Sequence, residues 1–339
     1  MYFAYMLQMI DNILICGTNW LGDSIMSMPA IQLLKQRQPS SKITMLVKPK
    51  LAALWKMHQA VDEMIPLEDG FAGALRGVSD VKKAGVSRAF IFPNSFRSAL
   101  LPFLAGVRER VGMRGHQRSW MLTRTVAPPS TPDRNHQSWE YIEIAGESAE
   151  RGASELPRLV IPWEVRTEVG KKFGIDTAGE LIGLIPGAAR GPSKRWPPER
   201  FVEVGYKVSE RAKCHTLVFG SDSERELCAE VANGIGRWAH NLAGNTTLSE
   251  LAALLGLCRV VICNDSGGMH LASAVGTKVV AIFGLTDPAT TGPMGKGHRV
   301  ICAEGVSKSR DIARTSSDAA GALRTIGAAR VAQAALDVM

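Results

Sequence analysis

The sequence contains no run of about 18 consecutive apolar residues, which is the length that a transmembrane helix requires. We therefore expect any contact with a membrane to be peripheral. Residues 1–7 are apolar, but they are too few to span a bilayer and lack the basic flank of a secretory leader. Because Met9 stands directly before the first predicted strand, Met1 and Met9 are both candidates for the first residue of the protein.

The sequence also lacks cysteine pairs of the CxxC type. Its six cysteines are spread along the chain, and several stand inside apolar runs that resemble strands. A reduced, buried thiol is the ordinary state of such a residue in an intracellular protein. We therefore predict a cytoplasmic protein with free thiols at Cys16, Cys214, Cys228, Cys258, Cys263 and Cys302.

Aromatic residues are scarce, at 6% of the chain, and no known nucleic-acid-binding motif occurs. The net charge is nevertheless +8, from 40 basic and 32 acidic residues. This excess suits an acidic substrate or an anionic membrane surface, and nucleic acid is the weaker alternative. The GxGxxG, Walker A, HExxH and GxSxG motifs are absent, which disfavours dehydrogenase, P-loop, zincin and α/β-hydrolase activities.

The pattern that is present is an alternation of short apolar strands with helices, which predicts parallel sheets covered on both faces. At 339 residues the chain exceeds a single compact core, so we expect two domains. Pro157 and Pro162 flank a linker that would separate residues 1–158 from residues 163–318, with an Ala-rich helix at 319–339. Strands are predicted near Met64 and at 12–16, 42–47, 88–92, 181–185, 215–219, 260–263 and 278–283, and helices at about 24–37, 51–57, 71–83, 198–210, 221–235, 248–257, 269–275 and 319–338.

The most informative segment is 261–270, where an apolar strand breaks into a polar turn that opens a helix. Unpaired N–H groups at a helix N-terminus favour an anionic ligand. Asp265 and Ser266 bring acceptor atoms to this turn, and Gly267 and Gly268 allow a ligand to approach the backbone. The alternatives are that Asp265 or Ser266 only caps the helix, and that His270 is a core histidine.

A second polar turn, Gly187 to Pro197, carries Lys194 and Arg195 before a helix that starts with proline. Such a loop is able to neutralise the diphosphate that leaves in a transfer reaction. The alternative is a basic loop exposed to solvent. Glu224 follows another strand and suits a ribose hydroxyl, but a capping box explains it equally well.

The third polar turn is Gly17 to Asp23, between the first strand and the first helix. Asp23 is a candidate base for an acceptor hydroxyl, and its alternative role is a helix N-cap. Ser24 caps equally well, which would leave Asp23 free to react. All three turns fall at the carboxyl ends of predicted strands, where open α/β sheets bind ligands.

Arginine is concentrated between residues 97 and 124. Arginine matches carboxylate and phosphate geometry better than lysine does. The six arginines are Arg97, Arg108, Arg110, Arg114, Arg118 and Arg124. Their concentration favours a binding site for an anionic acceptor over the alternative, an ordinary solvated surface.

Taken together, these motifs resemble glycosyltransferase family 9. The resemblance is carried by Gly22-Asp23 with Met28-Pro29-Ala30, by Lys194-Arg195-Trp196-Pro197, and by the segment from Asn264 to Pro288. Residues 93–100 and 110–115 are most similar to the lipopolysaccharide heptosyltransferases of this family. Three places depart from the family pattern: Gly268 and Leu285 replace prolines, and 302–317 holds one cysteine.

The resemblance implies a GT-B fold, in which two Rossmann-like domains with parallel sheets face a central cleft. It implies an inverting transfer of L-glycero-D-manno-heptose from ADP-heptose to the first heptose of the Kdo-lipid A inner core. It also implies an enzyme peripherally associated with the inner membrane. No metal or other cofactor is expected, and the chain has no DxD motif. The alternatives are addition of the first heptose, use of another nucleotide sugar, or a non-catalytic binder of sugar nucleotides or nucleic acid.

The resemblance also implies roles for individual residues. Asp23 would be the general base, and Lys194 would contact the donor phosphates. The C-terminal domain would bind the nucleotide sugar and the N-terminal domain the acceptor. The nucleotide-sugar residues would be Gly187, Lys194, Glu224, Asp265, Ser266, Gly267, Gly268 and His270, and the acceptor residues Asn94, Ser95, Arg97, Arg114 and Arg118.

Overall fold

The computed structural model describes residues 11–115, 117–147, 152, 155–309, 313 and 315–339. The chain forms two compact units. The first comprises Met1–Asn19, Ser27–Arg134 and Ser138–Glu155, and the second comprises Trp20–Met26, Asn135–Gln137 and Leu156–Met339. The two possible starts, Met1 and Met9, lie outside the described residues.

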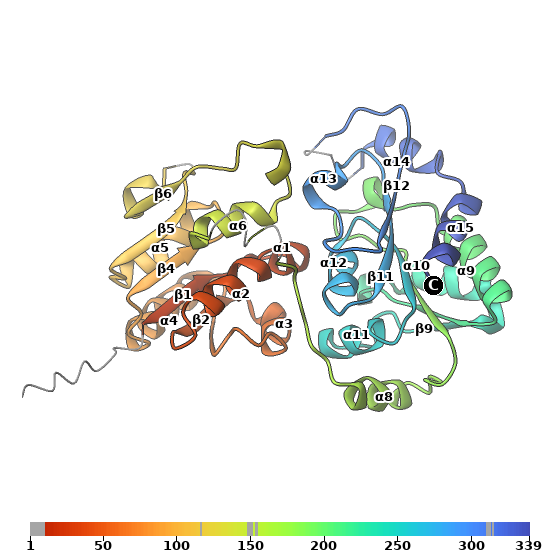
Figure 1. Ribbon diagram of the computed structural model, residues 1–339, viewed down its shortest axis with the longest axis horizontal. Helices are drawn as coiled ribbons and strands as arrows, with labels where there is room; N and C mark the ends of the chain where they lie inside the picture. Colours follow the sequence, from red (N-terminus) through yellow and green to blue (C-terminus); the bar gives the residue numbers. More distant parts are fainter. Residues whose placement is uncertain (1–10, 116, 148–151, 153–154, 310–312, 314) are drawn as a thin grey trace, which may run out of the picture. The chain divides into compact units, whose positions relative to one another are not determined.

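The first unit is built on a parallel sheet with the strand order β3-β2-β1-β4-β5-β6 (Figure 1). The central strands are almost continuously apolar and buried, as expected of a parallel sheet covered on both faces. Its strands are β1 (Asn12–Cys16), β2 (Lys42–Val47), β3 (Glu63–Pro66), β4 (Arg88–Ile91), β5 (Glu109–Met113) and β6 (Arg124–Val126).

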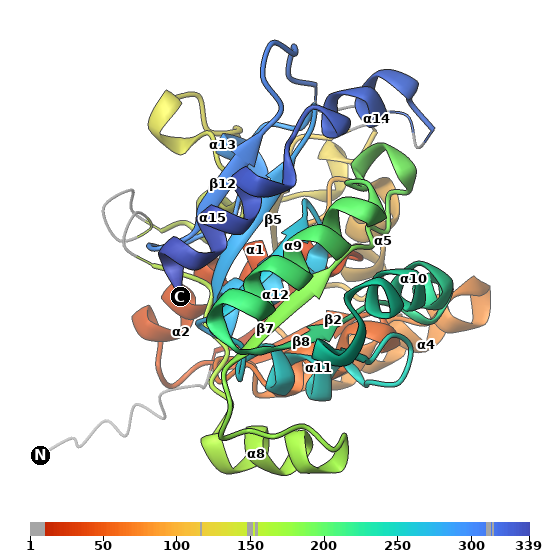
Figure 2. The same cartoon turned by 90° about the vertical axis from the view of Figure 1, so that its right-hand side faces the viewer.

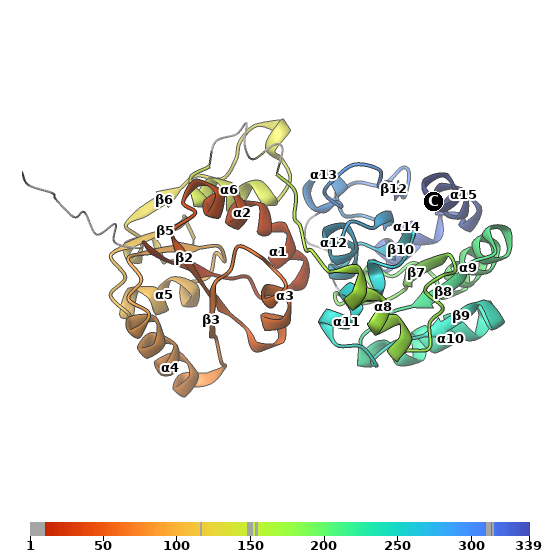
Figure 3. The same cartoon turned by 60° about the horizontal axis from the view of Figure 1, so that its bottom comes forward.

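Helices cover both faces of this sheet. The helices α2 (Met28–Arg37) and α6 (Ser138–Ala145) pack together, and α4 (Gly70–Lys83) packs beside α5 (Phe96–Leu104) (Figure 3). A Cβ added to Gly77 of α4 would lie 2.8 Å from Leu101 Cδ1, which shows how closely α4 and α5 approach. The shorter elements are α3 (Ala52–Lys56) and the 3-10 turns η1 (Pro49–Leu51), η2 (Ser119–Met121) and η3 (Pro132–Arg134).

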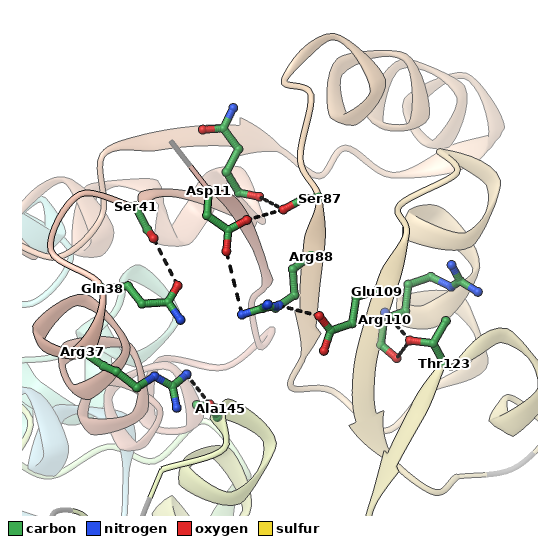
Figure 4. A network of polar contacts seen from close by, with 11 residues as sticks. Asp11, Arg37, Gln38, Ser41, Ser87, Arg88, Glu109, Arg110, Thr123 and Ala145 are labelled. Atoms are coloured by element: carbon green, nitrogen blue, oxygen red, sulfur yellow. Dashed lines mark hydrogen bonds and ion pairs between the residues drawn. The ribbon is translucent and has the colours of Figure 1, made fainter. Parts of the chain in front are cut away.

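A chain of ion pairs ties the starts of three neighbouring strands (Figure 4). Arg88 lies between Asp11, at 3.8 Å, and Glu109, at 2.6 Å. Beside it, the Arg110 N–H donates to Thr123 Oγ1 at 2.7 Å. These contacts fix the register of β1, β4 and β5 at the edge of the sheet where the strands begin.

The second unit repeats the plan with the strand order β12-β11-β10-β7-β8-β9, again parallel throughout. The strand β10 (Val260–Asn264) is buried along its whole length and lies between β7 (Leu181–Ile185) and β11 (Lys278–Phe283). The other strands are β8 (His215–Val218), β9 (Ala239–Asn241) and β12 (Arg299–Cys302).

Figure 2 shows α9 (Pro198–Ala212) and α15 (Ala328–Val338) side by side on one face of this sheet, and both contribute to a large apolar cluster. The helices α11 (Leu248–Leu255) and α12 (Gly267–Ala274) pack on each other. The remaining helices are α1 (Leu21–Met26), α8 (Trp163–Lys172), α10 (Arg225–Ile235), α13 (Pro288–Thr291) and α14 (Ser317–Arg324), with 3-10 turns η4 (Pro192–Lys194), η5 (Asp222–Glu224) and η6 (Gly236–Trp238).

The predicted α/β class with two parallel sheets is confirmed. Two predicted helices are wrong in their extent. The helix expected at about 24–37 is two helices, because Pro29 lacks the N–H that would continue the first into the second. The helix expected at 319–338 is also two, α14 and α15, separated by residues 325–327.

The cysteine prediction is confirmed, because all six are free thiols and five of them are buried. Burial raises the pKa of the Cys16 thiol to about 12, so this residue is an unreactive part of the core. None of the helices in the described part of the chain is both long and apolar enough to cross a membrane.

Candidate active site

The turn between β10 and α12 is the centre of the candidate site. Its backbone is fixed by Asp265, whose N–H donates to the Ile282 carbonyl at 3.2 Å. Ser266 occupies the N-cap position of α12 in extended backbone, yet its side chain makes no capping bond. Within the described residues its buried Oγ finds no partner. A buried hydroxyl left unpaired at a helix N-terminus suits a polar ligand atom, so the capping role is not the one that Ser266 plays.

Lys194 and Asp265 form an ion pair at this turn. The side chains are 14% and 7% exposed, so most of both lies out of water. Lys194 ends η4, and Pro192 together with the positive φ of Gly191 turns the loop towards β10. The loop is therefore not the solvated basic segment of the alternative reading, because its lysine is directed inward at the turn.

Asn264, the last residue of β10, was not singled out in the sequence. Its side chain is fully buried and holds two parts of the 186–196 loop. The amide Nδ2 donates to the Pro186 carbonyl at 2.8 Å, and Oδ1 accepts from the Trp196 N–H at 3.0 Å. Asn264 therefore fixes the loop that carries Lys194. The available signal was its place directly before Asp265, in a strand that is otherwise apolar.

Glu224 forms the capping box that was the alternative to a binding role. Its carboxylate accepts from the Ser221 N–H at 2.9 Å and completes a capping box before α10. The other oxygen approaches Arg195 at 3.4 Å. A Cβ at Gly187 would collide with the Glu224 carboxylate, so a larger residue there would displace this carboxylate from its capping box. A contact of Glu224 with ribose stays a prediction.

Asp23 is the third residue of α1, so it is inside the helix and is not its N-cap. Gln137 Nε2 donates to its Oδ1 at 3.3 Å. The helix packs directly on α12, since a Cβ on Gly22 would lie 3.0 Å from His270 Cδ2 and one on Gly267 would lie 3.0 Å from Leu21 Cβ. Asp23 therefore belongs to the same compact unit as the β10–α12 turn.

His270 is only 5% exposed. Burial lowers its pKa to about 4, and His136 and Lys194 act in the same direction against the opposing charge of Asp265. The imidazole is therefore neutral at pH 7, with one donor and one acceptor nitrogen. His270 is a buried histidine, as its alternative reading held, and it also lies among the charged groups of the turn.

The predicted acceptor residues lie in the first unit, around the start of α5. Asn94, Ser95, Arg97 and Arg114 are exposed. Ser95 also caps α5, because its Oγ accepts from the Ser98 N–H at 3.2 Å.

The prediction for Arg118 needs correction, because this residue is fully buried. Its guanidinium donates to the Met113 carbonyl at 2.7 Å, to the Ser95 carbonyl at 3.3 Å and also to the Pro93 carbonyl. Glycines at 112 and 115 make room for it, since a Cβ at either would lie within about 3 Å of the guanidinium group. Arg118 supports the segment that presents Asn94 and Ser95 and does not face a ligand itself.

Comparison with known proteins decides the family. The model of glycosyltransferase family 9 (heptosyltransferase) matches residues 79–320. Lipopolysaccharide heptosyltransferase 2 of Escherichia coli K12 is 32% identical over 309 residues, which cover 85% of this chain and 87% of that protein. The chain belongs to glycosyltransferase family 9. The enzyme of the same name from Salmonella typhimurium is 31% identical, with the same coverage.

The family 9 assignment extends to the fold. A solved structure described as Escherichia coli ADP-heptose lps heptosyltransferase II superposes with a TM-score of 0.83 at 28% identity, covering 96% of this chain and 98% of that one. The predicted GT-B class and glycosyltransferase activity are therefore confirmed. The roles assigned to single residues are not tested by these comparisons and stay predictions.

No group of three or more histidine, cysteine, aspartate or glutamate side chains could hold a metal ion within the described residues. The charges that lie at the β10–α12 turn are instead those of Lys194 and Asp265.

Proposed function

We propose that this chain transfers L-glycero-D-manno-heptose from ADP-heptose to the first heptose of the Kdo-lipid A inner core, with inversion at the anomeric carbon. The observation that carries the proposal is the β10–α12 turn. Here the Lys194–Asp265 pair lies at a helix N-terminus with the Ser266 hydroxyl, which no described residue contacts by a hydrogen bond. The relatives named lipopolysaccharide heptosyltransferase 2 support the sugar and the acceptor class.

In this proposal the donor diphosphate binds at the turn. The N–H groups at the start of α12 and the Lys194 ammonium group meet the negative charge that develops as the sugar–phosphate bond breaks. Lys194 then exchanges its carboxylate partner Asp265 for a phosphate oxygen. Ser266 Oγ, which has no partner among the described residues, donates to the same diphosphate.

Asp23 is the proposed general base. A carboxylate is a weak base for a sugar hydroxyl, so the proton moves late, when the new glycosidic bond has made the hydroxyl acidic. The acceptor oxygen then bonds to the anomeric carbon, its proton passes to Asp23, and ADP leaves with the electron pair of the broken bond. The hydrogen bond from Gln137 orients the carboxylate for this step.

The charge of the leaving group is thus met by protein groups, and we propose that the reaction needs no bound metal. We also propose that the enzyme works in the cytoplasm at the inner face of the cytoplasmic membrane, where its lipid-linked acceptor is anchored. The net charge of +8 supports attraction to an anionic surface.

A donor panel tests the proposal. Purified protein is given ADP-heptose or UDP-linked sugars with a mono-heptosylated Kdo-lipid A acceptor, while nucleotide release and product mass are followed with and without EDTA. We expect ADP release and one added heptose, unchanged by EDTA, and an inverted anomeric configuration in the product. Turnover with a UDP-sugar alone would contradict the donor assignment, and loss of turnover in EDTA would contradict the metal-free mechanism.

A further inference from the structure

A cluster of exposed apolar side chains lies over α5 and η2 of the first unit. Trp120 is 61% exposed, Leu104 51% and Phe96 42%. The Trp120 ring stacks edge-on to Phe103 with centroids 5.1 Å apart and lies 6.5 Å from Phe96. The rings therefore form one continuous surface along α5. We call it the α5 surface.

The neighbouring helix α4 adds to this apolar exposure. Phe71 is 81% exposed and Leu75 is 54% exposed, one helical turn apart. The two helices pack side by side (Figure 3). Lys48 chiefly, and then Arg97 of α5, lower the pKa of Asp69, the residue directly before α4. Single exposed apolar residues are ordinary in soluble proteins, but a group on two adjacent helices marks an interaction site.

The charge around the α5 surface is strongly positive. Residues 96–121 contain five arginines and one acidic residue. That acidic residue, Glu109, is paired with Arg88 (Figure 4). Arg97, Arg108 and Arg114 are exposed, whereas Arg118 is buried and Arg110 is turned back onto the Met121 carbonyl.

We propose that the α5 surface, together with Phe71 and Leu75 of α4, docks the enzyme on an anionic lipid bilayer. Tryptophan and phenylalanine side chains favour the boundary between headgroups and acyl chains, and arginine binds the phosphates above it. A second copy of the chain fits less well, because a symmetric contact would bring the same arginines face to face. Aliphatic residues such as Leu75 and Leu104 gain more from hydrocarbon than from a nucleic acid.

This inference rests on the proposed function in one respect, since an enzyme with a lipid-linked acceptor has to work at the surface of a bilayer. Phe96 of the α5 surface stands in the chain between the predicted acceptor residues Ser95 and Arg97. Docking here would therefore hold the acceptor-binding segment at the bilayer from which the acceptor projects.

Vesicle co-sedimentation of the full chain tests the inference, using phosphatidylethanolamine with phosphatidylglycerol and, separately, phosphatidylcholine alone. Neither contains the acceptor, so binding is measured apart from substrate recognition. We expect binding to the anionic vesicles that weakens with salt. Trp120→Ser should lower the partition coefficient about tenfold, and Arg108→Gln about fivefold.

Two matched substitutions in the second unit serve as controls. Trp163→Ser removes a tryptophan that is 58% exposed, and Arg211→Gln removes an exposed arginine, and neither should change binding. Transfer to a water-soluble, delipidated acceptor should be unchanged in Trp120→Ser, which separates a docking defect from a failure of the proposed activity. Equal binding by Trp120→Ser and Trp163→Ser, or no preference for anionic vesicles, would overturn the inference. Dimerisation that Trp120→Ser abolishes would do so as well.

Discussion

Lys194 and Asp265 neutralise each other in a place that water hardly reaches. Replacing one member of a buried pair leaves the other charge without compensation, which costs about 3 kcal/mol. We therefore predict that Lys194→Gln lowers the free energy of unfolding by about that amount and reduces kcat roughly 100-fold. Denaturant titration and initial rates measure the two effects.

The matched control is Lys207→Gln, which breaks an ion pair with Glu203 on the surface of α9. Because exposed pairs contribute little, this variant should change the free energy of unfolding by less than about 1 kcal/mol. Its kcat should stay within about twofold of the parent value. Equal unfolding free energies and equal kcat values in the two variants would show that Lys194 is not part of the active site.

Asp23 has a different expected signature, because a general base acts only in the transition state. We predict that Asp23→Asn lowers kcat by about 100-fold or more while the dissociation constant for ADP-heptose stays nearly constant. Asn keeps the shape of the side chain and the contact with Gln137. Initial rates and calorimetric titration with ADP-heptose check the two halves of the prediction. Near-normal turnover would show that another group takes the proton.

His58 offers a test that involves stability alone. It is 3% exposed, and burial lowers its pKa to about 4. An unfolded histidine titrates near 6.5, so between pH 6.5 and pH 4 the unfolded state binds a proton that the folded state does not. The stability contributed by the neutral ring is complete above pH 6.5 and is lost as the pH falls.

From pH 6.5 to pH 5 this loss amounts to about 2 kcal/mol for His58. We predict that His58→Gln shows a correspondingly flatter dependence of unfolding free energy on pH over this interval. Urea unfolding at several pH values gives the comparison. An identical slope in the parent protein and the variant would contradict the burial of a neutral ring.

At the scale of elements, one buried side chain bonds both ends of the loop at 186–196. Asn264 satisfies the Pro186 carbonyl and the Trp196 N–H, both inside the protein. We predict that Asn264→Ala costs about 2 to 3 kcal/mol, because these buried groups lose their partners, and that it raises KM for the donor. Asn245→Ala is the control, since Asn245 is exposed. A stable Asn264→Ala variant with unchanged KM would show that other contacts are enough to fix the loop.

The elements predicted most accurately from the sequence are strands that are buried on both faces and are therefore almost wholly apolar. The strands β1, β2, β7, β10 and β11 are of this kind. The sequence did not predict β5, because this strand begins with the charged Glu109 and Arg110 and the partner of Glu109, Arg88, comes from another strand. It also merged α1 with α2, since an apolar periodicity continues across Pro29.

The same limit applies to the site. The turns after β1, β7 and β10 were found from their polar residues, and the Lys194–Asp265 pair joins two of them. Sequence could not assign Arg118 to the interior, because an arginine is buried only when the fold supplies carbonyls for its guanidinium. Nor could it separate the capping role of Glu224 from a binding role, since both require a carboxylate at that position.

At the scale of the whole molecule, the chain consists of two units, each with a parallel sheet that has six strands in the described part of the chain. The residues of the β10–α12 turn and Asp23 belong to one unit, and the predicted acceptor residues belong to the other. Under the proposed function, donor chemistry and acceptor recognition therefore belong to separate parts of the chain. Substitutions among the predicted binding residues of one unit should therefore change KM for one substrate.

The most direct test of the account is the choice of acceptor. The purified enzyme is incubated with ADP-heptose and either Kdo2-lipid A or its mono-heptosylated form, and the product mass is measured. We predict one added heptose on the mono-heptosylated acceptor and none on the heptose-free one. Addition to the heptose-free acceptor, or no addition to either while a related heptosyltransferase works under the same conditions, would contradict the proposed function.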